Sequence, residues 1–266
     1  MSLFQESFKI LSDHQSVRLF NIIVGASQIF LALNSHQILG ICAVFLVAIW
    51  MTGFQDGFTT GLQFHYHPTF MVVGMIFLAG DGILVYRVFR HERKRFSKLL
   101  HLILHTLVLI FAVVALKAVF DSHNNHRNDQ GEPDPLPNLY SLHSWIGLTF
   151  VIAFFLQYFF GFLTFFFPGL SVPIRQFILP YHQAFGLIIL CFLAITAVMG
   201  ISEQAAWHHK CWTINHVLCS QQFLSTLLGI FILIFVLCIL LIILNPRWRR
   251  LPLPEEETLH RLTNID

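Results

Sequence analysis

Four histidines, each close to the start of a different long apolar segment, are the residues best suited to chemistry in this sequence. They are His67 in FHYHPTFM, His105 in LLHLILHTL, His143 in NLYSLHSW and His182 in LPYHQAFG. Ionisable side chains inside a membrane segment are costly, and by default they mark a functional site. A neutral imidazole is also the commonest metal ligand in proteins. The four histidines therefore predict metal ligation within a membrane.

The composition is that of an integral membrane protein. Of the 266 residues, 56% are hydrophobic and 11% are charged, with a mean hydropathy of +0.68, whereas soluble domains carry about 25% charged residues. A spanning helix needs about 20 apolar residues. The fold is therefore predicted to be all-α with six transmembrane helices, over residues 38–55, 66–89, 97–120, 139–167, 177–201 and 221–245. The net charge of +2 and the absence of a nucleic-acid-binding motif argue against a nucleic-acid partner.

The six-helix core is predicted to span residues 38–245, between an N-terminal cytoplasmic or interfacial segment (1–37) and a C-terminal tail (246–266). Residues 19–33 are also apolar, but the polar run 34–37 separates them from the next segment. They are predicted to form either an interfacial helix or an extension of the first span. A seventh span would place the termini on opposite sides, and six spans are preferred.

The distribution of charge predicts the orientation. The connection RVFRHERKRFSK at 87–98 is strongly basic, and three arginines follow the last span within 247–250. The loop at 121–134 is mostly acidic. Because basic residues gather on the cytoplasmic side, both termini and the basic connection are predicted to be cytoplasmic.

Span direction then pairs the histidines by depth. His67 and His143 begin spans that enter from the outer side, and His105 and His182 lie early in spans that enter from the cytoplasm. Two imidazoles at one depth fill both axial positions of a haem iron, which leaves no open position for oxygen and suits electron transfer. The central four helices are thus predicted to hold two haems. The alternative is that these histidines are buried polar residues bonded to neighbouring helices.

Several motifs resemble the cytochrome b561 family. They are FHYHPTFM, VYR at 85–87, LKAVFDSHN, LYSLHSWIGL and PIRQFILPYH, and the resemblance covers about residues 38–250. It implies two b-type haems held by the central four helices, with ligands matching His67 and His143 at the outer haem and His105 and His182 at the inner haem.

The resemblance also implies an activity. Family members carry electrons from cytoplasmic ascorbate across the membrane to ferric iron or monodehydroascorbate, as transmembrane ascorbate-dependent reductases. Such proteins reside in the plasma membrane or in endolysosomal or secretory vesicle membranes, in contact with membrane lipid, and commonly purify as homodimers.

The cytoplasmic substrate site implied by the resemblance is cationic. Arg87, Lys98 and Arg175 match its basic positions, and a cationic mouth suits the ascorbate anion. Related members often place a second lysine three residues before the haem histidine of the third span, where this chain has Leu102. The adjacent His101 either replaces that lysine or is an ordinary polar residue of the helix.

The outer substrate site implied by the resemblance comprises His123, Asn124 and Tyr140, which match positions that contact ascorbate or metal beside the outer haem. Imidazole can ligate a metal ion, and the nearby Asp121 would favour cations. The alternative is that these are ordinary polar loop residues.

Three further polar or thiol residues carry expectations. Asp81 lies near the cytoplasmic end of the second span and is expected to pair with a basic residue of the cytoplasmic mouth. Cys211 and Cys219 share an outer loop, where an oxidising compartment would allow a disulfide.

Two other classes of function compete with a reductase. One is a histidine-lined metal-ion transporter without haem, although Asp81 is the only carboxylate within the predicted spans that could help to carry a cation. The other is a structural or haem-storage membrane protein.

Overall fold

The structure is a computed structural model that describes residues 33–53 and 63–253. Six helices in these ranges are long and apolar enough to cross a membrane: Leu33–Gly53, Gln63–Val88, Lys94–Asn124, Leu142–Phe165, Val172–His208 and Ser220–Leu244. The prediction of an all-helical protein with six spans is therefore confirmed. The apolar segment 19–33 lies outside the described residues except for Leu33.

The second span is built from four consecutive helical pieces. They are η1 (Gln63–His65), α2 (Tyr66–Phe70), the π-helical η2 (Met71–Leu78) and α3 (Ala79–Val88). The later spans are α4 (Lys94–Asn124), α5 (Leu142–Phe165), α6 (Val172–His208) and α8 (Ser220–Leu244), with the short α7 (Lys210–Thr213) before α8 and η3 (Pro246–Trp248) after it. A π-helical stretch inside an α-helix is frequent at functional sites, and here it separates His67 from Asp81.

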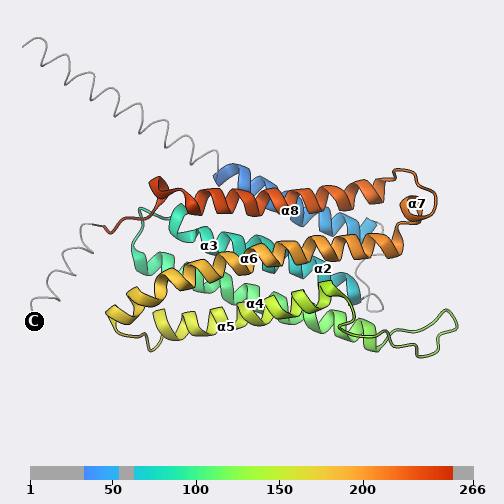
Figure 1. Ribbon diagram of the computed structural model, residues 1–266, viewed down its shortest axis with the longest axis horizontal. Coiled ribbons are helices and arrows are strands. Elements are labelled where there is room, and N and C mark those ends of the chain that lie inside the picture. The colour runs from blue at the N-terminus through green and yellow to red at the C-terminus, as the bar shows by residue number, and fades with distance from the viewer. Residues whose placement is uncertain (1–32, 54–62, 254–266) are drawn as a thin grey trace, which may run out of the picture.

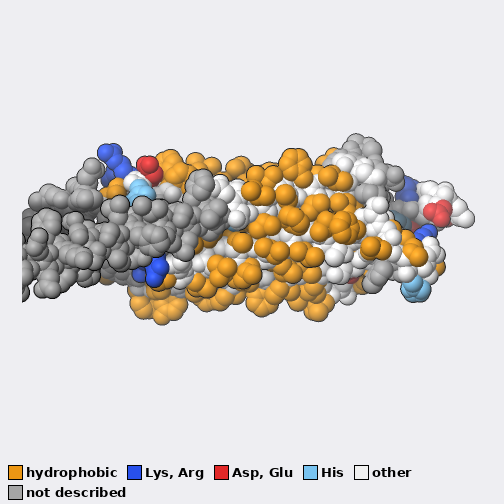
Figure 2. Space-filling model, turned by 90° about the horizontal axis from the view of Figure 1, so that it is seen from above, with side chains coloured by type: hydrophobic (Ala, Val, Ile, Leu, Met, Phe, Trp, Pro, Cys, Tyr) orange, Lys and Arg blue, Asp and Glu red, His pale blue; other side chains and the backbone are white. Residues whose placement is uncertain are grey.

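The helices run side by side along the long axis of the molecule (Figure 1). The second span packs along α4, α5 packs along α6, and α6 and α3 both contact α8. The turn with α7 and the loop between α4 and α5 lie at one end, and the described chain ends at the other. In the view of Figure 2, hydrophobic side chains cover the middle of the visible surface and charged side chains gather towards its two ends. This distribution fits a bundle that is surrounded by lipid.

The first helix (Leu33–Gly53) packs closely against the second span and α8. Its buried residues Val47, Trp50 and Met51 belong to one hydrophobic core with Phe235 of α8. The polar residues 34–37, which suggested a break in the sequence, are helical. They therefore extend the first helix instead of interrupting it.

The start of α5 is fixed by a capping box. The hydroxyl of Ser141, the N-cap residue, accepts a hydrogen bond from the backbone N–H of Ser144, and the Ser144 hydroxyl accepts one from the backbone N–H of Ser141. Such caps satisfy the free N–H groups at a helix start. Because the helix begins at Leu142, His143 lies in its first turn, at one end of the bundle.

Candidate functional site

The outer histidine pair faces across the bundle between α2 and α5. The ring centroids of His67 and His143 are 6.3 Å apart, and the rings are nearly perpendicular at 88°. The Nδ1 atom of His67 lies 3.2 Å from the Ala115 carbonyl oxygen, and that of His143 lies 2.9 Å from the Thr196 carbonyl oxygen. Because a carbonyl oxygen only accepts, both Nδ1 atoms carry the hydrogen and both Nε2 atoms keep a lone pair. Metal-binding histidines are typically held in this way.

A glycine provides room for one of these rings. A Cβ atom placed on Gly200 of α6 would lie 2.6 Å from Cε1 of His143, which is closer than any normal contact. The ring of His143 thus fits against α6 because position 200 has no side chain. Thr196, one turn earlier on the same helix, supplies the carbonyl that orients the ring.

The geometry of the outer pair recurs at the other end of the bundle, between His101 of α4 and His182 of α6. Their ring centroids are also 6.3 Å apart, with an interplanar angle of 68°. The Nδ1 atom of His101 donates to the Gly82 carbonyl oxygen of α3 at 2.8 Å. His101 is therefore held with its Nε2 lone pair free, as both outer histidines are.

His105, which the sequence predicted as the partner of His182, lies in a different environment. Its ring packs against His101 with centroids 4.4 Å apart, and its Nε2 atom faces Gly82, 2.7 Å from where a Cβ would stand. Its Nδ1 atom is buried without a hydrogen-bond partner. The carbonyl anchor of a metal-binding histidine is thus present for His101 and not for His105, so the geometry favours His101 as the partner of His182.

Both pairs fit a metal held between two imidazoles. A metal–nitrogen bond is about 2 Å long, so two imidazoles on opposite sides of one ion place their ring centres about 6 Å apart. The separation of 6.3 Å in both pairs agrees with that arrangement. A b-type haem, whose iron takes two axial imidazoles, fits these donor sets.

The basic residues predicted for the cytoplasmic site contact the ends of two helices. Lys98 donates to the Phe165 carbonyl oxygen at the end of α5, at 3.0 Å, and lies within electrostatic range of Arg175. Arg87 donates instead to the carbonyl oxygens of Ile243 (2.6 Å) and Asn245 (3.3 Å) at the end of α8. Cations are favourable at helix C-termini. The structure thus brings Lys98 and Arg175 together and places Arg87 against a different helix.

The residues predicted for the outer site gather where α4 ends and α5 begins. The side-chain oxygen of Asn124 accepts a hydrogen bond from Asn138 at 2.9 Å, and the Tyr140 ring stacks on Trp207 at 6.4 Å. The Nδ1 atom of His123 is buried without a partner. Partial burial, and then the negative charge of Glu203, raise the pKa of the Tyr140 hydroxyl, so at neutral pH this hydroxyl remains a hydrogen-bond donor.

The acidic residue expected to attract cations at the outer end is already engaged, because Asp121 forms an ion pair with Lys117 one turn earlier on α4. Within residues 33–53 and 63–253, no group of three or more histidine, cysteine or acidic side chains is placed to hold a metal ion.

Asp81 has different partners from those expected. Its Oδ1 atom accepts hydrogen bonds from Gln37 at 2.7 Å and from the ring of His36 at 3.1 Å. Both partners belong to the first helix, so the expectation of a basic partner from the cytoplasmic mouth is wrong. The reason is that the first helix continues through residues 34–37 and packs its polar first turn against α3.

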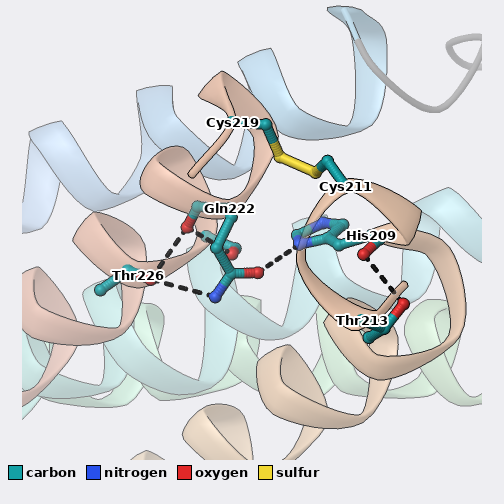
Figure 3. Close-up of a disulfide and its surroundings, with 7 residues drawn as sticks. His209, Cys211, Thr213, Cys219, Gln222 and Thr226 are labelled. Atoms are coloured by element: carbon teal, nitrogen blue, oxygen red, sulfur yellow. Dashed lines mark hydrogen bonds between the residues drawn. A yellow bond between two sulfur atoms is a disulfide. The ribbon is translucent and has the colours of Figure 1, made fainter. Parts of the chain in front are cut away.

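Cys211 and Cys219 form a disulfide that closes the short connection between α6 and α8 (Figure 3). Beside it, the fully buried His209 donates from Nδ1 to the side-chain oxygen of Gln222 on α8, at 2.7 Å. The His209 ring also meets Trp50 of the first helix edge-on, with centroids 5.7 Å apart. The disulfide therefore holds a connection that joins three spans at this end.

Replacing both Cys211 and Cys219 by serine is expected to lower the free energy of unfolding by about 2–4 kcal/mol, the usual contribution of a disulfide. Thermal unfolding in detergent, followed by tryptophan fluorescence, would show a melting temperature several degrees lower. Cys191→Ser, a change at an unbridged cysteine within α6, tests for a general effect of losing a thiol. A double variant that melts at the wild-type temperature would contradict a stabilising role.

The comparisons with known proteins agree with this arrangement. The family described as eukaryotic cytochrome b561 matches residues 66–208. A protein of Caenorhabditis elegans called "putative transmembrane ascorbate-dependent reductase CYB561 homolog" is 54% identical over 266 residues, 98% of this chain and 97% of the relative. The "transmembrane ascorbate-dependent reductase CYB561" of Mus musculus is 38% identical over 225 residues, 84% of this chain and 86% of the relative.

A plant relative, the "probable ascorbate-specific transmembrane electron transporter 1" of Oryza sativa subsp. japonica, is 35% identical over 171 residues, 62% of this chain and 70% of the relative. The family match includes every histidine of the two pairs described above. By the extent of both kinds of similarity, this chain is a multi-pass membrane protein that belongs to the eukaryotic cytochrome b561 family.

Proposed function

We propose that this protein is a transmembrane ascorbate-dependent reductase, which passes electrons from cytoplasmic ascorbate through two b-type haems to ferric iron or monodehydroascorbate on the other side. The observation that carries the proposal is the pair of imidazole couples near opposite ends of the bundle, both with ring centroids 6.3 Å apart. The names of the relatives in worm, mouse and rice support ascorbate as the electron donor.

The proposed ligands of the outer haem are His67 and His143, and those of the inner haem are His101 and His182. His101 thus replaces His105, which was predicted from the sequence, as the partner of His182. This change also removes the departure from the family pattern at Leu102, because Lys98 lies three residues before His101. The lysine that related members place three residues before the haem histidine is then present.

A haem held by His67 and His143, or by His101 and His182, would supply an iron that gains and loses one electron and, with both imidazoles bound, would suit electron transfer instead of oxygen binding. The protein's own part is to hold the rings and to exclude water. The carbonyl oxygens of Ala115, Thr196 and Gly82 fix the tautomers of His67, His143 and His101. Loss of a hydrogen bond that holds a metal-binding histidine commonly lowers metal affinity by about 10–100-fold.

The substrate sites are proposed at the two ends of the bundle. On the cytoplasmic side, Lys98 and Arg175, with Arg87 further along the same end, attract the ascorbate anion. On the outer side, His123, Asn124 and the protonated Tyr140 present an imidazole, an amide and a hydroxyl donor to the electron acceptor.

The same proposal places both termini in the cytoplasm, because the basic residues of 87–98 and 247–250 follow spans at that end. The core of residues 38–245 then lies in the plasma membrane or in an endolysosomal or secretory vesicle membrane, with the segments 1–37 and 246–266 outside it. A homodimer is the proposed assembly, on the resemblance to the family alone.

The purified protein reconstituted into ascorbate-loaded proteoliposomes tests the function. External ferric citrate, with a chromogenic chelator for ferrous iron, should be reduced at least tenfold faster than with protein-free vesicles or with vesicles lacking ascorbate. Monodehydroascorbate serves as the second acceptor. If neither acceptor is reduced, the proposal fails.

An absorption spectrum of the same preparation separates the competing classes. A reductase should show Soret and α bands that ascorbate changes to those of the reduced form. A metal-ion transporter would show no such bands, and a haem-storage protein would show bands that ascorbate leaves unchanged.

A further inference from the structure

A partly buried polar triad joins the first helix to α3 close to the inner histidine pair. Asp81 Oδ1 accepts hydrogen bonds from Gln37 at 2.7 Å and from His36 at 3.1 Å. His36 is 1% exposed, its ring stacks on Phe235 of α8 at 5.9 Å, and its Nδ1 atom is buried without a partner. None of the three side chains has a role in the proposed haem and substrate sites.

The triad lies one residue from the inner site along α3. Asp81 precedes Gly82, whose carbonyl oxygen receives the hydrogen bond from His101 Nδ1. Successive residues of a helix point about 100° apart, so α3 presents Gly82 to the histidines of α4 and Asp81 to the first helix. A change of charge at Asp81 is therefore separated from the inner pair by little more than the width of one helix.

The other ionisable groups near this stretch of α3 are few. From α4 they are His101 and His105, which face Gly82; from α6, His182, beside His101; and on α3 itself, Tyr86 and Arg87. After α8, Arg250 lies within electrostatic range of Tyr86 and Arg249 within range of Arg87. Arg87 is turned toward carbonyl oxygens at the end of α8. The one ionisable group that the structure shows bonded to the Asp81 carboxylate in residues 33–53 and 63–253 is thus His36.

The charge of this pair depends on one proton. With the Asp81 carboxylate ionised and His36 neutral, the pair is negative; with one further proton, it is neutral overall. A net charge in a membrane interior is costly, and a second negative charge nearby increases that cost because the effective dielectric constant is low. An electron that arrives at the inner histidine pair is such a charge.

We propose that the His36–Asp81 pair takes up one proton when one electron arrives at the inner site, and releases it when the electron moves on. The inference rests on the proposed function. The electron and the proton taken up match those that the donor loses, because an ascorbate monoanion loses one electron and one proton as it becomes the monodehydroascorbate radical. The electron enters the inner site and the pair gains one proton from the cytoplasmic side, to which the proton later returns.

Redox titration of the purified holoprotein at several values of pH, followed at the α band, tests this coupling. One proton per electron makes a potential fall by about 59 mV for each tenfold decrease in proton concentration. One of the two haems should approach this dependence within part of the range from pH 5.5 to 8.5. Asp81→Asn should reduce its slope by at least half and leave the potential of the other haem unchanged.

His36→Gln is a second variant that keeps a hydrogen-bond donor beside Asp81, and it should likewise change the slope. Asp121→Asn, which removes a half-buried carboxylate at the other end of the bundle, on α4, is the matched control and should keep the wild-type slope at the inner haem. A wild-type slope in both Asp81→Asn and His36→Gln would overturn the inference, as would a pH-independent wild type. If Asp81→Asn does not fold, His36→Gln decides alone. A preparation without haem bands would instead contradict the proposed function.

Discussion

Replacing His101 by alanine is expected to leave one haem per chain and to slow transmembrane electron transfer at least about 100-fold. The Nδ1 atom of His101 is held by the Gly82 carbonyl oxygen, and its ring stands 6.3 Å from that of His182. Alanine offers no ligand in its place. Because electrons would have to pass the inner half of the bundle without this site, the outer haem alone would not support transfer across the membrane.

The matched variant is His105→Ala, one turn along the same helix. The His105 ring contacts His101 but has no carbonyl anchor on its Nδ1 atom, so this variant should retain two haems. The ratio of haem to protein, from absorption spectra of the purified variants, and the rate of ferric citrate reduction by proteoliposomes are the measurements. Retention of both haems in His101→Ala together with loss of one in His105→Ala would return the ligand to His105.

Helical periodicity could not choose between these two histidines, although the lysine spacing of the family, met by Lys98, favours His101. His101 and His105 are four residues apart, so both lie on the same face of α4, and both are compatible with a partner on α6 in depth and direction. The choice depends on which ring meets the carbonyl oxygen of Gly82 and which meets its Cα. Those contacts arise from the packing of α3 against α4, which one sequence read by periodicity does not contain.

The spans themselves could be predicted because hydropathy is a local property of the chain. The ends of the spans could not be predicted, since a helix can continue beyond the apolar stretch. The fifth span was expected over 177–201, whereas α6 runs from Val172 to His208. Its polar ends remain helical outside the apolar region, where Arg175 lies at one end and Trp207 stacks on Tyr140 at the other.

The partners of Asp81 likewise could not be predicted from the sequence, because they come from another helix. The basic connection near the end of the second span made an arginine or lysine the natural expectation. The structure satisfies the carboxylate from the first helix instead, through His36 and Gln37. The sequence leaves open whether residues 34–37 belong to the first helix, and a partner for Asp81 from that helix could therefore not be predicted.

The second large effect is expected from a single methyl group at the outer site. In Gly200→Ala, the new Cβ would lie 2.6 Å from Cε1 and 3.0 Å from Nδ1 of His143. The ring would have to turn away, which would also break its 2.9 Å hydrogen bond to the Thr196 carbonyl oxygen. Loss of ligand orientation commonly lowers metal affinity by about 10–100-fold, so the outer haem should be lost or bound at least tenfold more weakly.

Gly229→Ala is the control for this change, because a Cβ at Gly229, in the middle of α8, would have no neighbour within 4 Å. Both variants replace a helical glycine by alanine, which by propensity alone favours the helix. Absorption spectra should therefore show two haems in Gly229→Ala and one in Gly200→Ala, with His101 and His182 still holding the inner haem. If Gly200→Ala keeps both haems and the wild-type rate of ferric reduction, the expectation is wrong. Either the close approach of His143 to α6 is not required for ligation, or the His143 ring tolerates a displacement that the Thr196 carbonyl oxygen was proposed to prevent. A further variant, His143→Ala, then tests the ligand itself: loss of the outer haem in it would keep His143 as the ligand and discard only the role of position 200.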